Sequence, residues 1–190
     1  SSTYNHAIMA KKMISEEVEN KFISVFDSLS ASIGETLVSL KIFDLIKNGY
    51  NNIQVTEKVN LYIKEMQTFF ILESLDNLIK SGRIGLLKSK LTSLLSIKPI
   101  MRGNENGEIS MVEKARGSNK AFRRLVEIIG ENGDKFEDKI LGIAHCNCLE
   151  KALDFKKEVL KRYNFKDIII VETGGISTAY ANDGGLIIAF

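Results

Sequence analysis

The stretch ILGIAHCNCLEKALDFKKEVLKRYNFKDIIIV, residues 140–171, decides the fold class of this chain. It opens with an apolar run at 140–144 and closes with a second at 167–171, and short runs of this kind are typical of buried strands. The segment between the two runs is an amphipathic helix with one apolar face, formed by Ala152, Phe155, Val159 and Tyr163. Two strands joined by a helix indicate an α/β fold, in which helices pack on a sheet.

A hairpin and a final strand extend the predicted sheet. Residues 97–101 and 109–113 flank a polar loop, 103–107, that contains Asn-Gly, and this arrangement is typical of a β-hairpin. Pro99 has no backbone N–H to donate, so it favours an edge position for the first strand. Together with a last strand at 186–190, the hairpin and the helical crossover predict a mixed sheet flanked by helices.

The beginning of the chain does not supply a sheet of its own. A helix up to Val18, a buried strand at 21–26 and a helix at 34–47 are predicted there, and a lone strand leaves its backbone groups unpaired on both edges. We therefore expect residues 1–60 to be the remainder of a first domain and 61–190 to form a second. The other expected elements are a helix from Asn51 or Asn52, a strand at 68–72, helices at 75–80 and 86–95, and a helix capped by Ser118.

Composition narrows the class of protein. Hydrophobic residues make up 44% of the chain and charged residues 26%, which is a globular balance, and the formal charge of +2 gives no reason to expect nucleic acid as a partner. No apolar run reaches the roughly 18 to 20 residues that span a bilayer, and the first residues lack the apolar block of a signal peptide. Cytoplasmic residence is the expectation that follows.

Two regions have the composition of anion-binding backbone. The segment 172–185 carries four glycines among short polar side chains, which suits close approach of backbone N–H groups to an anion, although a tight turn explains it equally well. Ser1-Ser2-Thr3-Tyr4 opens a helix, where free N–H groups favour a carboxylate, or where one hydroxyl simply caps the helix. Arg83 and Arg116 are candidates for gripping a partner, the alternative being solvated loop arginines.

A catalytic set is not visible. His145 could act as a general base, but no nucleophile has the spacing of a triad, and a structural histidine is the simpler interpretation. Cys146 and Cys148 are too close for a disulfide framework and lack further ligands for zinc, so they are interpreted as small residues at a strand-to-helix junction. No paired carboxylates, metal-ligand cluster or nucleotide motif stands out, which favours binding over catalysis.

Several motifs, in order along the whole chain, resemble the DegV family. They are Ser1-Ser-Thr-Tyr4, Asp27-Ser-Leu-Ser-Ala-Ser-Ile-Gly34, Ser81-Gly-Arg-Ile84, Leu95-Ser-Ile-Lys-Pro-Ile100, Glu113-Lys-Ala-Arg116, Ala144-His-Cys-Asn147 and the end of the chain from Ala181 to Phe190. Each motif is weak alone, and the ordered set is specific. The resemblance implies a two-domain α/β architecture: a Rossmann-like N-terminal domain, incomplete here, and an α/β C-terminal domain with a mixed sheet. The family pattern begins well before residue 1.

The resemblance also implies a function. Members of the family bind a long-chain fatty acid between the domains and, where a fatty acid kinase is present, present its carboxyl group to that ATP-binding subunit, which forms an acyl phosphate for phospholipid synthesis in bacteria. Ser1 and Ser2 match the carboxylate-binding motif, and Arg83 and Arg116 match kinase-docking arginines. Tyr180 stands where many members carry a histidine at the fatty-acid site, and the family's Thr-Ser-x-Pro segment is absent. No catalytic residue, cofactor or metal is expected. The competing hypothesis is a phosphoryl-transfer or hydrolytic enzyme that uses His145 and the 172–185 segment.

Overall fold

A computed structural model describes residues 2–18, 21–84 and 97–190. Its helices are α1 (Ser2–Glu17), α2 (Ile33–Lys47), α3 (Asn52–Glu65), α4 (Asp76–Lys80), α6 (Ser118–Asn132), α7 (Leu149–Leu160) and α8 (Gly175–Ala181), with a short 3-10 helix η2 (Phe136–Asp138). Its strands are β1 (Thr68–Ile71), β2 (Ile97–Gly103), β3 (Ile109–Arg116), β4 (Ile140–His145), β5 (Asp167–Glu172) and β6 (Leu186–Ala189). The helix predicted at 86–95 lies outside the described residues.

The six strands form one mixed sheet in the order β3-β2-β1-β6-β4-β5. The crossover through α7 makes β4 and β5 parallel, while every other pair of neighbours is antiparallel. β6 pairs with β1 on one side and β4 on the other, and all four of its residues are buried. The predicted fold class, a mixed sheet flanked by helices, is confirmed.

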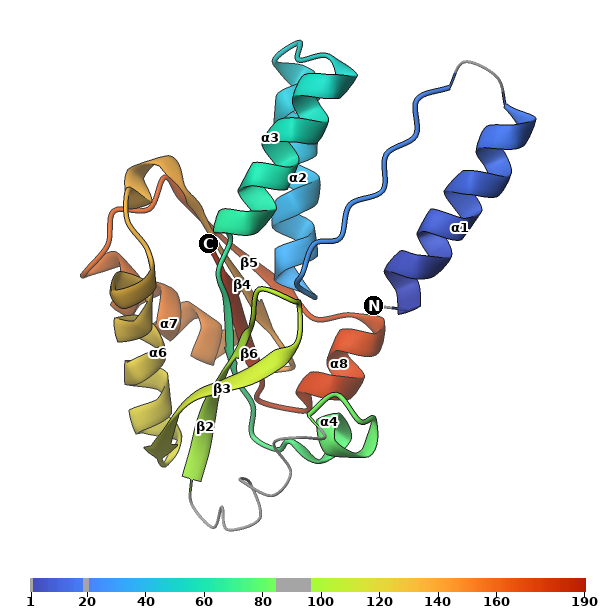
Figure 1. Cartoon of the computed structure of the whole chain (residues 1–190). Helices are drawn as coiled ribbons and strands as arrows, with labels where there is room; N and C mark the ends of the chain where they lie inside the picture. The colour runs from blue at the N-terminus through green and yellow to red at the C-terminus, as the bar shows by residue number, and fades with distance from the viewer. Residues whose placement is uncertain (1, 19–20, 85–96) are drawn as a thin grey trace.

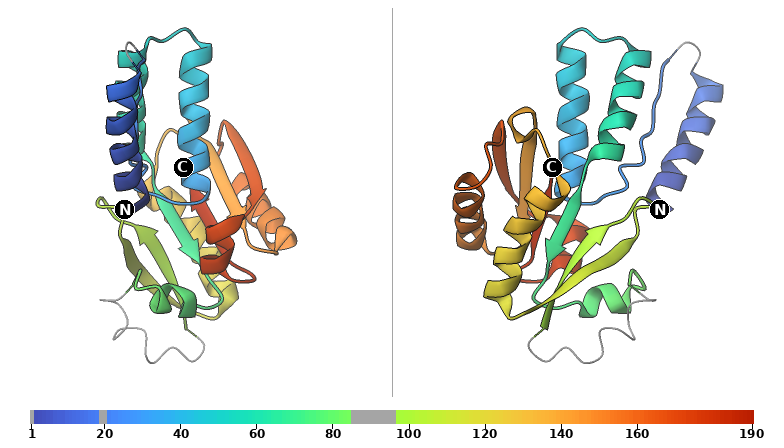
Figure 2. Two further views of the ribbon diagram at one scale, coloured as in Figure 1. Left: turned by 90° about the vertical axis from the view of Figure 1, so that its right-hand side faces the viewer. Right: turned by 60° about the vertical axis from the view of Figure 1, so that its left-hand side comes forward.

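Helices cover the two faces of the sheet unequally. On one face α6 and α7 complete a large core that includes Leu125, Phe155 and Leu186, all with no exposed surface (Figure 1). On the other face α2 lies over β4 and β6, and a Cβ added to Gly142 would come within 2.3 Å of Ile33. The glycine therefore permits α2 to approach the sheet closely. The short helices α4 and α8 cover only one end of this second face (Figure 2).

Helices α2 and α3 form an antiparallel pair that extends beyond the sheet (Figure 2). Asn51 caps α3 through a complete capping box: its side chain accepts from the N–H groups of Ile53 and Gln54, and Gln54 accepts from the Asn51 N–H. The helix predicted to start at Asn51 or Asn52 is confirmed. Helix α1 stands apart from the sheet, beyond the extended segment that precedes α2, and none of its described residues is buried (Figure 1).

Three local predictions are wrong, each for a physical reason. Residues 21–26 are extended but form no strand, because no strand in the described part of the chain pairs with them, and Phe22 is 57% exposed. Pro99 is not on an edge strand, since β2 lies between β3 and β1, but β1 pairs only with Ile100–Arg102 and so needs no N–H from Pro99. Gly117, not Ser118, occupies the N-cap of α6.

Candidate functional site

The glycine-rich segment 172–185 holds a helix as well as turns, which corrects the prediction of a loop. After β5, the Thr178 hydroxyl donates a hydrogen bond to the Thr173 carbonyl at 2.8 Å. The chain then makes α8 and leaves it at Asn182, whose φ of 56° lies in the left-handed region that asparagine tolerates. Helix α8 brings Tyr180 and Ala181 against the second face of the sheet.

Helices α4 and α8 are joined by one asparagine pair. Asn77 of α4 donates through Nδ2 to the Ala179 carbonyl at 2.6 Å and to Asn182 Oδ1 at 2.8 Å. The α4 helix ends at Ser81, and Gly82 follows with a φ of +73°, a conformation that favours glycine. This turn places Arg83 beside α8.

Two of the predicted site residues meet here. The Arg83 guanidinium lies over the Tyr180 ring, 5.5 Å from its centroid, and also donates through Nη1 to the Ser81 carbonyl at 3.0 Å. Tyr180 is half-buried against the apolar cluster of the second face, and its hydroxyl makes no hydrogen bond with the residues that the structure describes. A half-buried ring with an unpaired hydroxyl can offer a hydrogen bond to a polar ligand atom.

The stretch 27–34 forms a tight polar turn before α2. Leu29 and Ser32 both have positive φ, 51° and 56°, and Ser30 Oγ lies 2.8 Å from the hydroxyl of Thr68 on β1. A Cβ on Gly34 would come within 2.0 Å of Ser30 Oγ, so the glycine is needed for this contact. The turn therefore links the start of α2 to the sheet.

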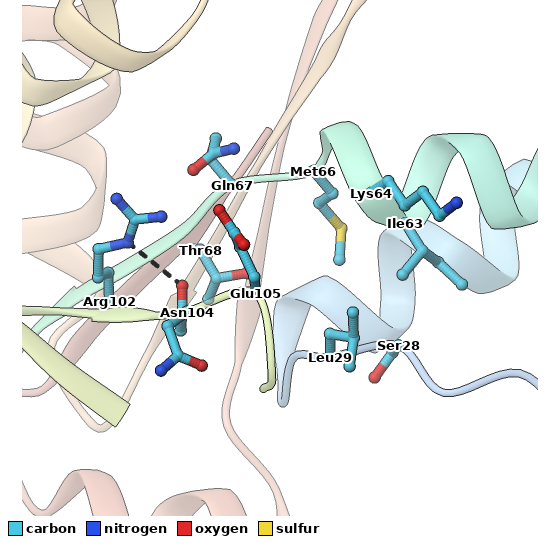
Figure 3. Close-up of a pocket in the computed structure, with 11 residues that line it drawn as sticks. Ser28, Leu29, Ile63, Lys64, Met66, Gln67, Thr68, Arg102, Asn104 and Glu105 are labelled. Atoms are coloured by element: carbon cyan, nitrogen blue, oxygen red, sulfur yellow. Dashed lines mark hydrogen bonds between the residues drawn. The ribbon is translucent and has the colours of Figure 1, made fainter. Parts of the chain in front are cut away.

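A cavity of about 290 Å³ lies between this turn, the end of α3 and the β2–β3 hairpin. Figure 3 shows the side chains of Arg102 and Gln67 at one end of the cavity and those of Leu29, Ile63 and Met66 at the other. The lining also includes the charged side chains of Lys64, Arg102 and Glu105. The cavity therefore suits water or a polar ligand better than a bare hydrocarbon chain.

Large apolar side chains stand exposed on the three helices α1, α2 and α3 and on the segment that joins the first two. They are Met9, Met13 and Ile14 on α1, Leu40, Phe43 and Ile46 on α2, Ile53 and Leu61 on α3, and Phe22 in the segment between α1 and α2. Phe43 is 64% exposed and Met13 is 66% exposed. Apolar surface of this extent marks a binding or docking surface more often than ordinary solvent-facing surface. Helices α1 to α3 thus carry apolar side chains that the described residues leave uncovered.

The other predicted site residues lie apart from this pair. Ser2 is exposed in the first turn of α1 and makes no hydrogen bond with a described residue, and Ser1 lies outside the described residues. Arg116 is the last residue of β3 and lines a hollow of about 570 Å³ together with Lys120 and Arg123. The structure therefore brings Arg83 and Tyr180 into contact, and among the described residues neither Ser2 nor Arg116 contacts this pair.

Sequence reasoning missed a charge cluster centred on Glu73. Its carboxylate pairs with Lys98 at 2.7 Å and Lys151 at 3.0 Å, and accepts from the Ser118 hydroxyl at 3.3 Å. Burial raises the pKa of Glu73, but the hydrogen bonds and charges of the two lysines outweigh it, so the net effect lowers the pKa. Lys151 also donates to the Gly184 carbonyl at 2.7 Å, and the cluster thereby fixes the chain between α8 and β6. No spacing in the sequence joins residues so far apart.

His145 has the surroundings of a structural residue. It is 6% exposed, and its Nδ1 accepts a hydrogen bond from the Cys148 N–H at 3.3 Å, at the start of α7. Cys146 is buried between β4 and α7, as expected for a strand-to-helix junction, and burial raises the pKa of the Cys148 thiol. Within the described ranges no three acidic, histidine or cysteine side chains are grouped to hold a metal ion, and no helix is long and apolar enough to cross a bilayer.

These features define an α/β protein with a mixed six-stranded sheet and with exposed apolar side chains on helices α1 to α3. A family model described as "Uncharacterised protein, DegV family" matches residues 1–190. A DegV domain-containing protein of Streptococcus pyogenes serotype M1 is 31% identical over 190 residues, which cover 100% of this chain and 67% of the relative. The chain belongs to the DegV family.

Solved structures agree with this assignment. A DegV-family protein from Ruminococcus gnavus, refined with vaccenic acid, is 43% identical with a TM-score of 0.92, and the match covers 100% of this chain and 68% of that one. The fatty acid kinase (Fak) B3 protein of Streptococcus pneumoniae, loaded with linoleic acid, is 29% identical with a TM-score of 0.92 and covers 100% and 67%. The fold is thus that of proteins whose structures hold fatty acids.

Proposed function

We propose that this protein binds a long-chain fatty acid and presents the carboxylate to a fatty acid kinase, which forms the acyl phosphate. The observation that carries the proposal is the set of exposed apolar side chains on α1, α2 and α3, together with a Tyr180 hydroxyl that makes no hydrogen bond with a described residue. Two solved relatives hold vaccenic acid and linoleic acid, which supports the proposal of a fatty-acid ligand. The second relative is described as a fatty acid kinase (Fak) B3 protein, which supports the proposal of a kinase partner.

Physical chemistry favours this class of ligand. Each methylene that leaves water contributes about 0.8 kcal/mol, so a long acyl chain gains affinity from apolar surface alone. Few polar groups are then needed, and they act at the carboxylate, where they set the orientation of the ligand. We propose that the acyl chain lies in a tunnel between a first domain, to which residues 1–60 contribute, and a second domain formed by residues 61–190.

The roles of the site residues follow from the family pattern. Ser1, Ser2 and Tyr180 are proposed to bind the carboxylate, and Arg83 and Arg116 to dock the ATP-binding kinase subunit. The protein would act in the bacterial cytoplasm as a carrier, without a cofactor or a catalytic residue of its own. The enzyme hypothesis loses its main support because the proposed base, His145, is buried and already accepts a backbone hydrogen bond.

The test is direct measurement of a bound acyl chain. The natural full-length protein, purified from cells, should carry a fatty acid in native mass spectrometry and should take up oleate after delipidation. Adding the kinase subunit and ATP should convert the bound oleate to its acyl phosphate. A protein that is empty when purified and cannot be loaded would refute the proposal. If the protein takes up oleate but the kinase forms no acyl phosphate, the proposal of lipid binding stands and the proposal that the protein presents the carboxylate to the kinase is refuted.

Two variants separate the roles of the residues. Tyr180→Phe should weaken oleate binding, because it removes the hydroxyl and keeps the ring. Arg116→Glu should leave oleate binding unchanged and raise the concentration of loaded protein that half-saturates the kinase, because it reverses the charge of an exposed docking residue. Lys166→Glu reverses the charge of an exposed residue in the turn between α7 and β5, so it is the matched charge-reversal control and should alter neither quantity.

A further inference from the structure

Arg83 depends on Tyr180 for its position. The arginine is exposed, and among the described residues its side chain makes one other contact, the local bond from Nη1 to the Ser81 carbonyl in the same turn. Among the described residues no carboxylate lies within ion-pair distance of its guanidinium. The ring of Tyr180, whose centroid lies 5.5 Å from the guanidinium carbon, joins this side chain to another element of the described structure.

The ring itself is held firmly. Tyr180 packs on the apolar cluster of the second face, and Asn77 fixes α4 to α8 with two short hydrogen bonds on either side of the tyrosine, at Ala179 and Asn182. A flexible arginine that stacks on a fixed ring loses little further freedom when it binds a partner, because part of its ordering has already occurred. The stack thus pre-orders an exposed cation beside α8.

The two functional parts of Tyr180 are chemically separable. The ring face attracts the cation through its quadrupole, whereas the hydroxyl is a hydrogen-bonding group at the ring edge. The hydroxyl is unpaired among the described residues, so it can bind a ligand oxygen while the ring still holds Arg83. A carboxylate that accepts a hydrogen bond from the hydroxyl brings its own negative charge near the guanidinium, and the attraction between the two charges adds to the cation–ring contact.

We propose that Tyr180 is a positioning residue that links the state of the acyl site to the docking surface: its hydroxyl binds the fatty-acid carboxylate, and its ring holds Arg83 in the orientation that the kinase recognises. The inference rests on the proposed function for the identity of ligand and partner. It adds that Arg83 is ordered through the tyrosine, and that it is ordered best when the carboxylate is bound.

Four variants of the full-length protein test this link: Tyr180→Phe, Tyr180→Leu, Arg83→Ala, and the double variant Tyr180→Leu/Arg83→Ala. Three quantities are measured: the dissociation constant for oleate, the concentration of oleate-loaded protein that half-saturates the kinase subunit, and the NMR shift of the Arg83 Nε–H, which a ring face moves upfield. Tyr50→Leu is the matched control, because Lys58 lies over the Tyr50 ring at 5.0 Å, on the surface of the α2–α3 pair.

The phenylalanine and leucine variants should differ. Tyr180→Phe should bind oleate several-fold more weakly, yet keep the half-saturating concentration and the ring shift of Arg83. Tyr180→Leu should also lose the ring shift and raise the half-saturating concentration by about 2- to 5-fold, the range expected for an exposed cation–ring contact. Arg83→Ala should raise that concentration without affecting oleate binding. The double variant should dock no worse than Arg83→Ala, because two residues that act through one contact are not additive.

Each result decides the matter. An unchanged Arg83 shift in Tyr180→Leu, or docking losses that add in the double variant, would overturn the link. An Arg83 shift that is the same with and without oleate would overturn its dependence on loading. If the wild-type protein binds no oleate, the proposed function fails, while the NMR comparison of the phenylalanine and leucine variants still decides whether the ring positions Arg83. Tyr50→Leu should leave all three quantities unchanged.

Discussion

Replacing Gly142 by alanine tests how closely α2 lies on the sheet. The new Cβ would meet Ile33 Cγ1 at 2.3 Å and Leu37 Cγ at 3.3 Å, whereas carbon atoms in contact normally stand about 3.5–4.0 Å apart. Ile33 has no exposed surface into which it could rotate, so α2 itself must move. Overpacking of this kind costs about 1–3 kcal/mol. Replacing glycine in a strand returns about 0.5–1 kcal/mol, which leaves a net loss of about 0–2.5 kcal/mol.

The assay is urea unfolding of the full-length protein, followed by circular dichroism, with Gly174→Ala as the matched control. Gly174 has a φ of −122° and nothing within 4 Å of its added Cβ, so its replacement should change the free energy of unfolding by less than about 0.5 kcal/mol. Adding Ile33→Ala to Gly142→Ala should restore space, so the double variant should lose less stability than the sum of the single losses. Equal stability of the Gly142 and Gly174 variants, or strict additivity in the double variant, would refute the close contact.

Three further predictions concern caps, charges and exposed surface. Asn51→Ala should lower the free energy of unfolding by about 1 kcal/mol, because it removes the capping box with Gln54, and an unchanged urea midpoint would contradict this. The pKa of Glu73 is lowered in the folded state, so its ion pairs with Lys98 and Lys151 should stabilise the protein above about pH 4.5, and that contribution should disappear as the pH falls through the folded pKa. Glu73→Gln should therefore flatten the acid limb of the stability curve, and an identical limb would count against the cluster. The 190-residue chain expressed alone should be oligomeric or poorly soluble, because its exposed apolar side chains seek cover, and light scattering that finds a stable monomer would disprove this.

Local patterns sufficed for much of the fold. The apolar runs at 140–144 and 167–171, the Asn-Gly hairpin and the helical spacing of α7 are short-range signals, and the structure places each where it was predicted. The strand predicted at 21–26 failed because strand formation depends on a neighbour, which a local pattern does not contain. The ordered motifs were sufficient to indicate the family before any three-dimensional information.

The candidate site was only partly predictable. Motif position singled out Arg83 and Tyr180 separately, but their contact joins residues far apart in the sequence and depends on how α4 and α8 pack. The Glu73 cluster is another example, since Lys98, Ser118 and Lys151 come from three different elements. Such contacts are set by topology, which a single sequence reveals only through its family resemblance.

The central place of β6 has a consequence for biosynthesis. This strand is translated after the other five, yet it joins β1 on one side to β4 on the other. Until residues 186–189 leave the ribosome, the nascent chain can form only two separate ribbons, β1-β2-β3 and β4-β5, each with an unpaired edge. Closure of the sheet is therefore a late event, and a chaperone that shields these two edges would protect the half-made protein from aggregation.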